Sequence, residues 1–211
     1  MLQIQTVDPQ IKATEIGELR IRTFKWLLAE HIEPRETLLD LGAGHCSFAK
    51  RAREAGYKVT AVDGRTERLP DDLDGIEFVK SDVRELDVTG FGVIAILGLL
   101  YHLTLEDQED LLRRCSYGAT VILDTQIHDP HKVGDIAEDW ARELTRAGEY
   151  EGVRFPERNN PMASIGNPIS FWHTEDSLLR LTDRCGYANV TKVEPVYFST
   201  YGARRFYVLT P

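Results

Sequence analysis

Cysteines and long apolar runs are scarce in this sequence. The three cysteines, Cys46, Cys115 and Cys185, stand far apart, and no two form a C-x-x-C pair. Disulfide frameworks and structural zinc sites need cysteines in defined sets, so we expect free thiols in a reducing compartment. The longest apolar run, residues 93–100, has the length of a buried strand and is too short to cross a bilayer. No secretory signal is recognised, so the sequence predicts a cytoplasmic protein with no membrane partner.

The charge balance disfavours a polyanionic partner. The chain has 25 lysines and arginines against 34 aspartates and glutamates, a net charge of −9. Because phosphate binding draws on clustered basic residues, a nucleic-acid partner is not expected. A length of 211 residues is sufficient for one domain with a full core. We therefore expect a single domain over residues 1–211 that acts on a small molecule, with its oligomeric state left open.

The clearest local pattern begins at residue 37. Leu38, Leu39 and Leu41 make a short apolar run of the buried-strand type. Gly42, Ala43 and Gly44 follow directly, and glycines permit a turn in which the backbone approaches a ligand with no Cβ in the way. This part of the chain is therefore predicted to be a strand that ends in a ligand-binding turn.

The next segment completes a βαβ unit. Apolar residues recur at helical spacing over residues 46–55, and Gly56 stands where a helix C-cap glycine belongs. Residues 58–62 are predicted to be the second strand, with Asp63 at its carboxyl end. In such units the ligand crevice lies outside the carboxyl ends of the strands.

Two cofactors use this arrangement, and the residues around the turn distinguish them. A nicotinamide dinucleotide requires G-x-G-x-x-G/A, whereas Ser47 stands at the third small position here. Asp63 suits the ribose of either cofactor, because a carboxylate accepts both hydrogen bonds of a vicinal diol. Asp40 comes just before the glycine turn, in the order Asp-Leu-Gly-Ala-Gly. On these residues the chain resembles the class I S-adenosylmethionine-dependent methyltransferases.

The resemblance implies a fold and a cofactor. The fold would be α/β, a three-layer Rossmann-like arrangement with a mostly parallel seven-stranded sheet and an antiparallel C-terminal β-hairpin. The cofactor would be S-adenosyl-L-methionine, with S-adenosyl-L-homocysteine as product. The cofactor-binding residues that it implies are Asp40, Gly42, Ala43, Gly44, Asp63, Gly64, Arg65, Ser81, Asp82, Val83, Leu97 and Gly98.

Within this set, three acids would gather around one adenosyl group. Asp82 would accept a hydrogen bond from the adenine amino group, and the backbone N–H of Val83 would meet a ring nitrogen. Asp40 and Asp63 would complete the group from the ends of the first two strands. A helix N-cap or Asx turn is the alternative role of Asp82.

The remaining elements follow from periodicity and capping signals. Thr174 and Ser177 begin a capped helix, and Thr104 or Leu105 begins another. A short helix and loop are expected after Asp63. A leading helix is predicted over residues 13–31. Further strands are predicted over residues 76–79, 92–97, 120–123, 189–198 and 204–209, and the last two of them form a hairpin.

Tyr101 and His102 follow the predicted strand 92–97 and would stand at the mouth of the site. The pKa of histidine suits a general base near neutral pH, so His102 is the first candidate for that role. Tyr101 and His128 are the other catalytic candidates, and Asp124 and His173 are reserves. Tyr101 would gain from cation–π attraction to a sulfonium.

Residues 127–172 are rich in glycine, proline and asparagine, apart from a helical pattern over 136–147. A long irregular insertion is typical of a lid or binding loop, so we expect a substrate cap. The substrate-binding candidates are Tyr101, Arg154, Trp172 and His173. His128 and His131 lack a second cluster of metal ligands, and no metal is predicted.

The function that these residues predict is methyl transfer to an oxygen or nitrogen of a small-molecule acceptor by in-line displacement. Three alternatives stay open: an RNA-directed methyltransferase, an NAD-dependent oxidoreductase and a non-catalytic protein that binds S-adenosylmethionine. Ser47 and the predicted C-terminal hairpin disfavour the oxidoreductase. The sequence Gly-Leu-Leu-Tyr after residue 97 lacks the Asn/Asp-Pro-Pro-Tyr/Phe motif of base methylation, but ribose and wobble positions remain possible targets.

Overall fold

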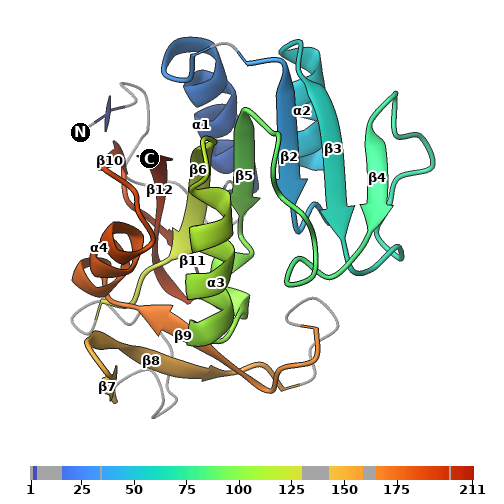
Figure 1. The fold of residues 1–211 in the computed structure, drawn as a ribbon. Helices are drawn as coiled ribbons and strands as arrows, with labels where there is room; N and C mark the ends of the chain where they lie inside the picture. The colour runs from blue at the N-terminus through green and yellow to red at the C-terminus, as the bar shows by residue number, and fades with distance from the viewer. Residues whose placement is uncertain (1, 4–15, 34, 130–142, 159–164, 200) are drawn as a thin grey trace.

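The computed structural model describes residues 2–3, 16–33, 35–129, 143–158, 165–199 and 201–211. Their centre is a nine-stranded sheet in which β1, β10, β12, β6, β5, β2, β3 and β4 lie in this order, with β11 paired to β12. A separate three-stranded sheet lies at one end of the molecule (Figure 1).

Five neighbouring strands of the large sheet run parallel. They are β2 (Thr37–Leu41), β3 (Lys58–Asp63), β4 (Glu77–Lys80), β5 (Val93–Leu97) and β6 (Thr120–Gln126). All five residues of β5 are buried, which explains its continuous apolar sequence. The chain order reverses between β2 and β5, and ligands of open α/β sheets bind at such a switch point.

The C-terminal strands turn the sheet antiparallel. They are β10 (Asn189–Glu194), β11 (Tyr197–Ser199) and β12 (Gly202–Thr210), and β12 runs antiparallel to both β6 and β10. Seven of the nine strands form the predicted mostly parallel sheet with its antiparallel C-terminal hairpin, which is therefore confirmed, and β1 and β11 are two short additional strands. The predicted strand 189–198 is divided at Pro195, which has no N–H for the ladder. At the far edge β1 (Leu2–Gln3) pairs parallel with β10.

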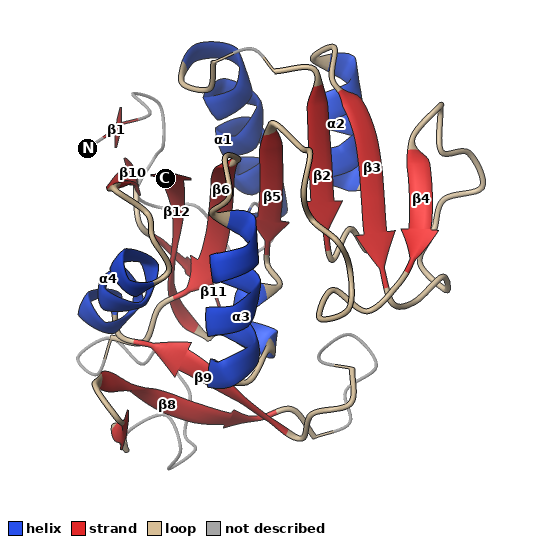
Figure 2. Ribbon diagram, in the orientation of Figure 1, coloured by secondary structure: helices blue, strands red, loops and turns tan. Residues whose placement is uncertain are grey.

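Helices cover both faces of the sheet and form the predicted three layers (Figure 2). The helices are α1 (Ile16–Glu30), α2 (Ser47–Glu54), α3 (Leu105–Cys115) and α4 (Glu175–Arg184), with the short 3₁₀ helix η2 (Leu100–His102) before α3. One apolar core joins α1 and α2 to the sheet, and another joins α3 and α4. The side chains of Thr104 and Thr174 accept hydrogen bonds from the backbone of Asp107 and Ser177, as the capping signals predict.

The small sheet contradicts part of the prediction for residues 127–172. It consists of β7 (Thr145–Ala147), β8 (Tyr150–Pro156) and β9 (Ile169–His173), paired antiparallel. Residues 145–147, predicted as the end of a helix, form a strand because they pair with β8. Of the rest of that predicted helix, residues 143–144 are not helical and residues 136–142 lie outside the described residues. This sheet lies at the edge to which the carboxyl ends of β2–β5 point (Figure 1).

The predicted short helix after Asp63 is also wrong. Residues 64–76 form loops and turns, because Asp74 and Gly75 both have left-handed backbone angles, φ of 50° and 76°. Among the described residues, no helix has the length and apolarity that crossing a membrane requires.

Candidate functional site

The glycine turn after β2 is held against the neighbouring strand. The backbone N–H groups of Gly42 and Ala43 both donate to the carbonyl of Val62, at 2.8 and 3.0 Å. Gly42 has φ of 73°, and a Cβ there would lie 3.2 Å from the Cβ of Leu99. Glycine is therefore required at position 42 by both backbone angle and space.

Asp63 links this turn to the end of β3. One carboxylate oxygen accepts from the backbone N–H of Gly44 at 2.8 Å, and the other accepts from that of Arg65 at 2.9 Å. The side chain is largely buried, yet it lines a cavity. Each oxygen has a second lone pair, so the carboxylate can still accept the two hydrogen bonds of a diol.

Two adjoining cavities lie along the carboxyl ends of the parallel strands. The first has a volume of about 110 Å³ and the second about 450 Å³. Gly42, Arg68, Gly98 and His102 line both, so the two form one continuous crevice. The predicted cofactor residues that line it are Gly42, Ala43, Gly44, Asp63, Gly64, Arg65, Ser81, Asp82, Val83, Leu97 and Gly98.

Asp40 departs from the predicted group of three acids. It is 1% exposed, lines neither cavity and accepts a hydrogen bond from the backbone of Ala49 in α2. Burial raises the pKa of this carboxyl from 3.8 to about 7. Alternation along β2 turns its side chain towards the helix rather than the crevice, so only Asp63 and Asp82 face the same cavity.

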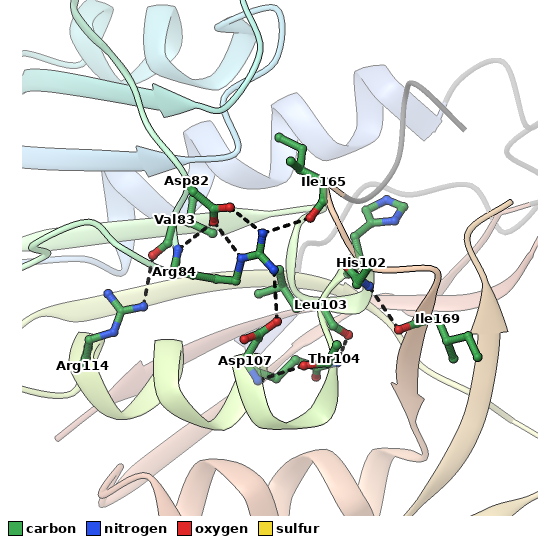
Figure 3. A network of polar contacts seen from close by, with 12 residues as sticks. Asp82, Val83, Arg84, His102, Leu103, Thr104, Asp107, Arg114, Ile165 and Ile169 are labelled. Carbon is green, nitrogen blue, oxygen red and sulfur yellow. Dashed lines mark hydrogen bonds and ion pairs between the residues drawn. The ribbon is translucent and has the colours of Figure 1, made fainter. Parts of the chain in front are cut away.

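Asp82 is tied to the neighbouring loop. Arg84 donates to it from Nε at 2.9 Å and from the backbone at 3.0 Å, and this contact lowers the pKa of Asp82. Figure 3 shows Arg84 extended between Asp82, Asp107 and the carbonyl of Ile165. Arg84 thereby joins the end of β4, helix α3 and the segment before β9.

Ile165 brings the small sheet to the first cavity. A Cβ on Gly64 would lie 2.4 Å from Cδ1 of Ile165, so the two residues are in close contact. Arg84 donates to the carbonyl of Ile165 at 3.0 Å. Ile165, in the segment just before β9, therefore covers the part of the crevice next to Asp63.

A histidine–carboxylate pair stands where the two cavities meet. Nδ1 of His102 lies 3.1 and 3.2 Å from the two carboxylate oxygens of Glu157. Glu157 is 3% exposed and follows β8, and its backbone donates to Pro168 at 2.9 Å. Asn167 donates to the carbonyl of His102 at 3.2 Å. Residues next to the strands of the small sheet thus hold both the ring and the backbone of His102.

Asp124 at the end of β6 is the centre of a second polar cluster. It is fully buried and accepts from Arg20 Nε at 2.6 Å, from Arg204 Nε at 2.9 Å and Nη2 at 2.8 Å, and from the Tyr197 hydroxyl. The nearby guanidiniums outweigh desolvation and hold its pKa below the ordinary value. Arg204 also donates to the Tyr101 hydroxyl at 3.1 Å.

Solved structures share this architecture. The N-terminal domain of EvdMO1, crystallised with SAH, aligns with a TM-score of 0.68 at 20% identity over 97% of this chain and 82% of that one. A 1,6-didemethyltoxoflavin-N1-methyltransferase from Burkholderia thailandensis was crystallised with 1,6-didemethyltoxoflavin and S-adenosylhomocysteine. It aligns with a TM-score of 0.58 at 18% identity, over 97% of this chain and 91% of that one. An S-adenosylmethionine-dependent methyltransferase from Mesorhizobium loti aligns with a TM-score of 0.59 at 16% identity, over 89% of this chain and 98% of that one. No protein-family model and no curated protein sequence matches the chain.

The chain has the fold of the class I S-adenosylmethionine-dependent methyltransferases. In this methyltransferase fold β12 lies antiparallel inside the sheet, which disfavours the nicotinamide alternative. The likeness is one of fold, since each identity is at or below 20%.

The crevice includes only some of the predicted catalytic and substrate residues. Tyr101 and His102 line it, with ring centroids 4.3 Å apart. Trp172, which belongs to the small sheet, packs edge-on against Tyr101, and their ring centroids are 5.7 Å apart. His128 instead lines a separate cavity beside α4, and Arg154 lines one between the start of α3 and the small sheet.

His173 is a core residue. It is 3% exposed, and its Nδ1 lies 2.8 Å from the Ser177 hydroxyl at the start of α4. Burial lowers its pKa to about 3, so the imidazole is neutral in the folded chain. The three cysteines are free and buried, and the described ranges contain no group of three or more potential metal ligands.

Glu157 and Arg204 were not predicted from the sequence. Neither stands in a recognisable motif, and their partners are 55 and 80 residues away in the chain. The only sequence signal was the placement of Arg204 in a strand that pairs with β6.

Proposed function

We propose that the protein is an S-adenosylmethionine-dependent methyltransferase that acts on an oxygen or nitrogen of a small molecule, with the β7–β9 sheet as its substrate cap. The observation that carries the proposal is the continuous crevice, in which the glycine turn, Asp63 and the His102–Glu157 pair meet. The SAH-bound structures with the same fold support the choice of cofactor.

The residues of the crevice fit the cofactor. Asp63 would accept the ribose hydroxyls, while Ser81, Asp82 and Val83 would surround the adenine. Gly98 supports a close approach of the methionyl end, because its backbone has φ of 90° and leaves no room for a Cβ. Arg20, whose Nη2 donates to the carbonyl of Leu97, is the candidate for the methionyl carboxylate.

The cofactor supplies a methyl group on a sulfonium, whose sulfur keeps the bonding electron pair when the lone pair of the acceptor takes the methyl. The protein's contribution is to hold the acceptor at attack distance in a shielded crevice. Glu157 can only accept, so we assign the proton of His102 to Nδ1. Nε2 is then the basic atom that receives a proton from a hydroxyl or amine acceptor.

The cofactor assignment is tested by calorimetry. S-adenosylhomocysteine is expected to bind the purified protein, and NAD is not. Asp63→Ala should weaken that binding about 10- to 100-fold, because it removes two hydrogen bonds to a charged acceptor. Asp183→Ala, an exposed acid on α4, is the matched control. Equal affinity of the wild type and Asp63→Ala would contradict the proposal.

The role of His102 is tested by turnover. His102→Ala is expected to reduce methyl transfer about 10²- to 10⁴-fold, measured with the best acceptor from a panel of phenols, amines and acids. Affinity for S-adenosylhomocysteine should stay within a few-fold. Glu157→Gln should reduce turnover less, since its amide oxygen can still accept from Nδ1. Unchanged turnover of His102→Ala would remove the residue from the mechanism.

A further inference from the structure

The second cavity has a charge opposite to that of the whole protein. The chain has a net charge of −9, yet the described residues that line this cavity of about 450 Å³ include three arginines and two histidines and no aspartate or glutamate. The arginines are Arg20, Arg68 and Arg204. A cavity with one sign of charge concentrates ligands of the other sign.

Arg204 is held rigidly with donors to spare. The residue is 7% exposed, and its guanidinium is fixed by Asp124 and by the Tyr101 hydroxyl. These contacts use three of the five N–H groups that a guanidinium offers. Nη2 lies 2.7 Å from the position of a Cβ on Gly98, and Nη2 of Arg20 lies 2.9 Å from it, so both guanidiniums abut the same glycine of the crevice.

Arg68 differs from the other two arginines because it has no protein partner in the ranges that the structure describes. It lines both cavities, and its Nη1 lies 3.7 Å from the position of a Cβ on Gly44. A half-buried guanidinium without a partner costs free energy unless a ligand supplies the opposite charge. Asp124 lies behind Arg20 and Arg204 and is fully buried, so it does not face the ligand.

Asp124 compensates one of the three guanidinium charges from behind, and the rest is not compensated by bound cofactor. Its one carboxylate can pair with one arginine, but its sulfonium and ammonium groups bring further positive charge. We propose that the methyl acceptor is an anion whose carboxylate or phosphate group binds in the second cavity, with Arg204 as the principal donor and Arg68 as the supporting charge. This inference rests on the proposed function. The ring of Tyr101 lines the same cavity, with its centroid 5.0 Å from the guanidinium carbon of Arg204.

The test uses probes that differ only in charge. Benzoate, phenyl phosphate and the neutral benzamide are titrated by calorimetry into protein saturated with S-adenosylhomocysteine. At least one anion is expected to bind about tenfold or more tightly than benzamide, since hydrogen bonds between ions are roughly twice as strong as neutral ones. The stronger of the two anions identifies the acceptor group as a carboxylate or a phosphate.

Two variants connect the effect to the arginines. Arg68→Met should reduce the affinity for the preferred anion about tenfold and leave benzamide unaffected, because Arg68 has no partner in the described structure to lose. Arg204→Lys retains the positive charge but removes the paired N–H donors of the guanidinium, and a similar loss of affinity for the anion is expected. Arg51→Met on the exposed side of α2 is the matched control.

The outcomes separate the two proposals. Failure of S-adenosylhomocysteine to bind would overturn the proposed function and this inference with it. Normal binding of S-adenosylhomocysteine, together with equal affinity for both anions and benzamide, would overturn the inference alone. An anion preference that survives in both Arg68→Met and Arg204→Lys would also overturn it.

Discussion

Replacing Asp40 by asparagine is expected to remove a pH-dependent loss of stability. Burial in β2 beneath α2 raises the pKa of this carboxyl from 3.8 to about 7, and the nearby charge of Asp63 adds to the effect. The hydrogen bond from Ala49 acts in the opposite direction. Asparagine keeps the size of the side chain and its oxygen acceptor, but it does not titrate.

The sign of the effect follows from proton binding. Above its ordinary pKa the carboxyl releases its proton in the unfolded chain but keeps it in the folded chain up to about pH 7. Stability therefore falls as the pH rises between these two values. Each pH unit is worth about 1.4 kcal/mol, so the wild type should lose about 2.5 kcal/mol from this group between about pH 5 and about pH 8.

The assay is urea unfolding, followed by circular dichroism, of both proteins at the two pH values. The wild type should lose about 2.5 kcal/mol more than Asp40→Asn, and this double difference cancels any constant cost of the new amide. Asp183→Asn, exposed on α4, should follow the wild type. Changes that agree within about 0.5 kcal/mol in the wild type and Asp40→Asn would refute the reasoning from burial.

Two further predictions concern buried groups outside β2. Asp124→Asn should destabilise the fold by about 3–5 kcal/mol in urea, because Arg20 and Arg204 lose the charge that compensates them; a loss below about 1 kcal/mol would contradict this account. His173 is neutral in the folded chain and charges in the unfolded chain below its ordinary pKa of 6.5, so stability is lost as the pH falls through that value. At about pH 4.5 the wild type should have lost about 2.5 kcal/mol more than His173→Gln, and parallel acid unfolding of the two would disprove it.

Prediction from the sequence failed where contacting residues are distant in the chain, or where a side chain could lie on either face of the sheet. The β8–β9 pairing joins Val153 to Trp172, and neither segment shows this pairing in its own periodicity. Asp40 and Asp63 both stand near strand ends in the sequence. The side chain of Asp40 nevertheless points away from the crevice, because side chains alternate along β2 and that of Asp40 lies on the face covered by α2.

The sequence alone determined the features that depend on a few neighbouring residues: the buried strands, the glycine turn with its left-handed backbone, the threonine caps and the antiparallel C-terminal hairpin. Backbone angle, capping and apolar periodicity act over a few residues, so they can be read locally. The tertiary structure decided which charges meet: His102 with Glu157 across 55 residues, and Asp124 with Arg204 across 80. Those contacts depend on how the small sheet and β12 pack against the crevice, and packing of that kind leaves no local signal in the chain.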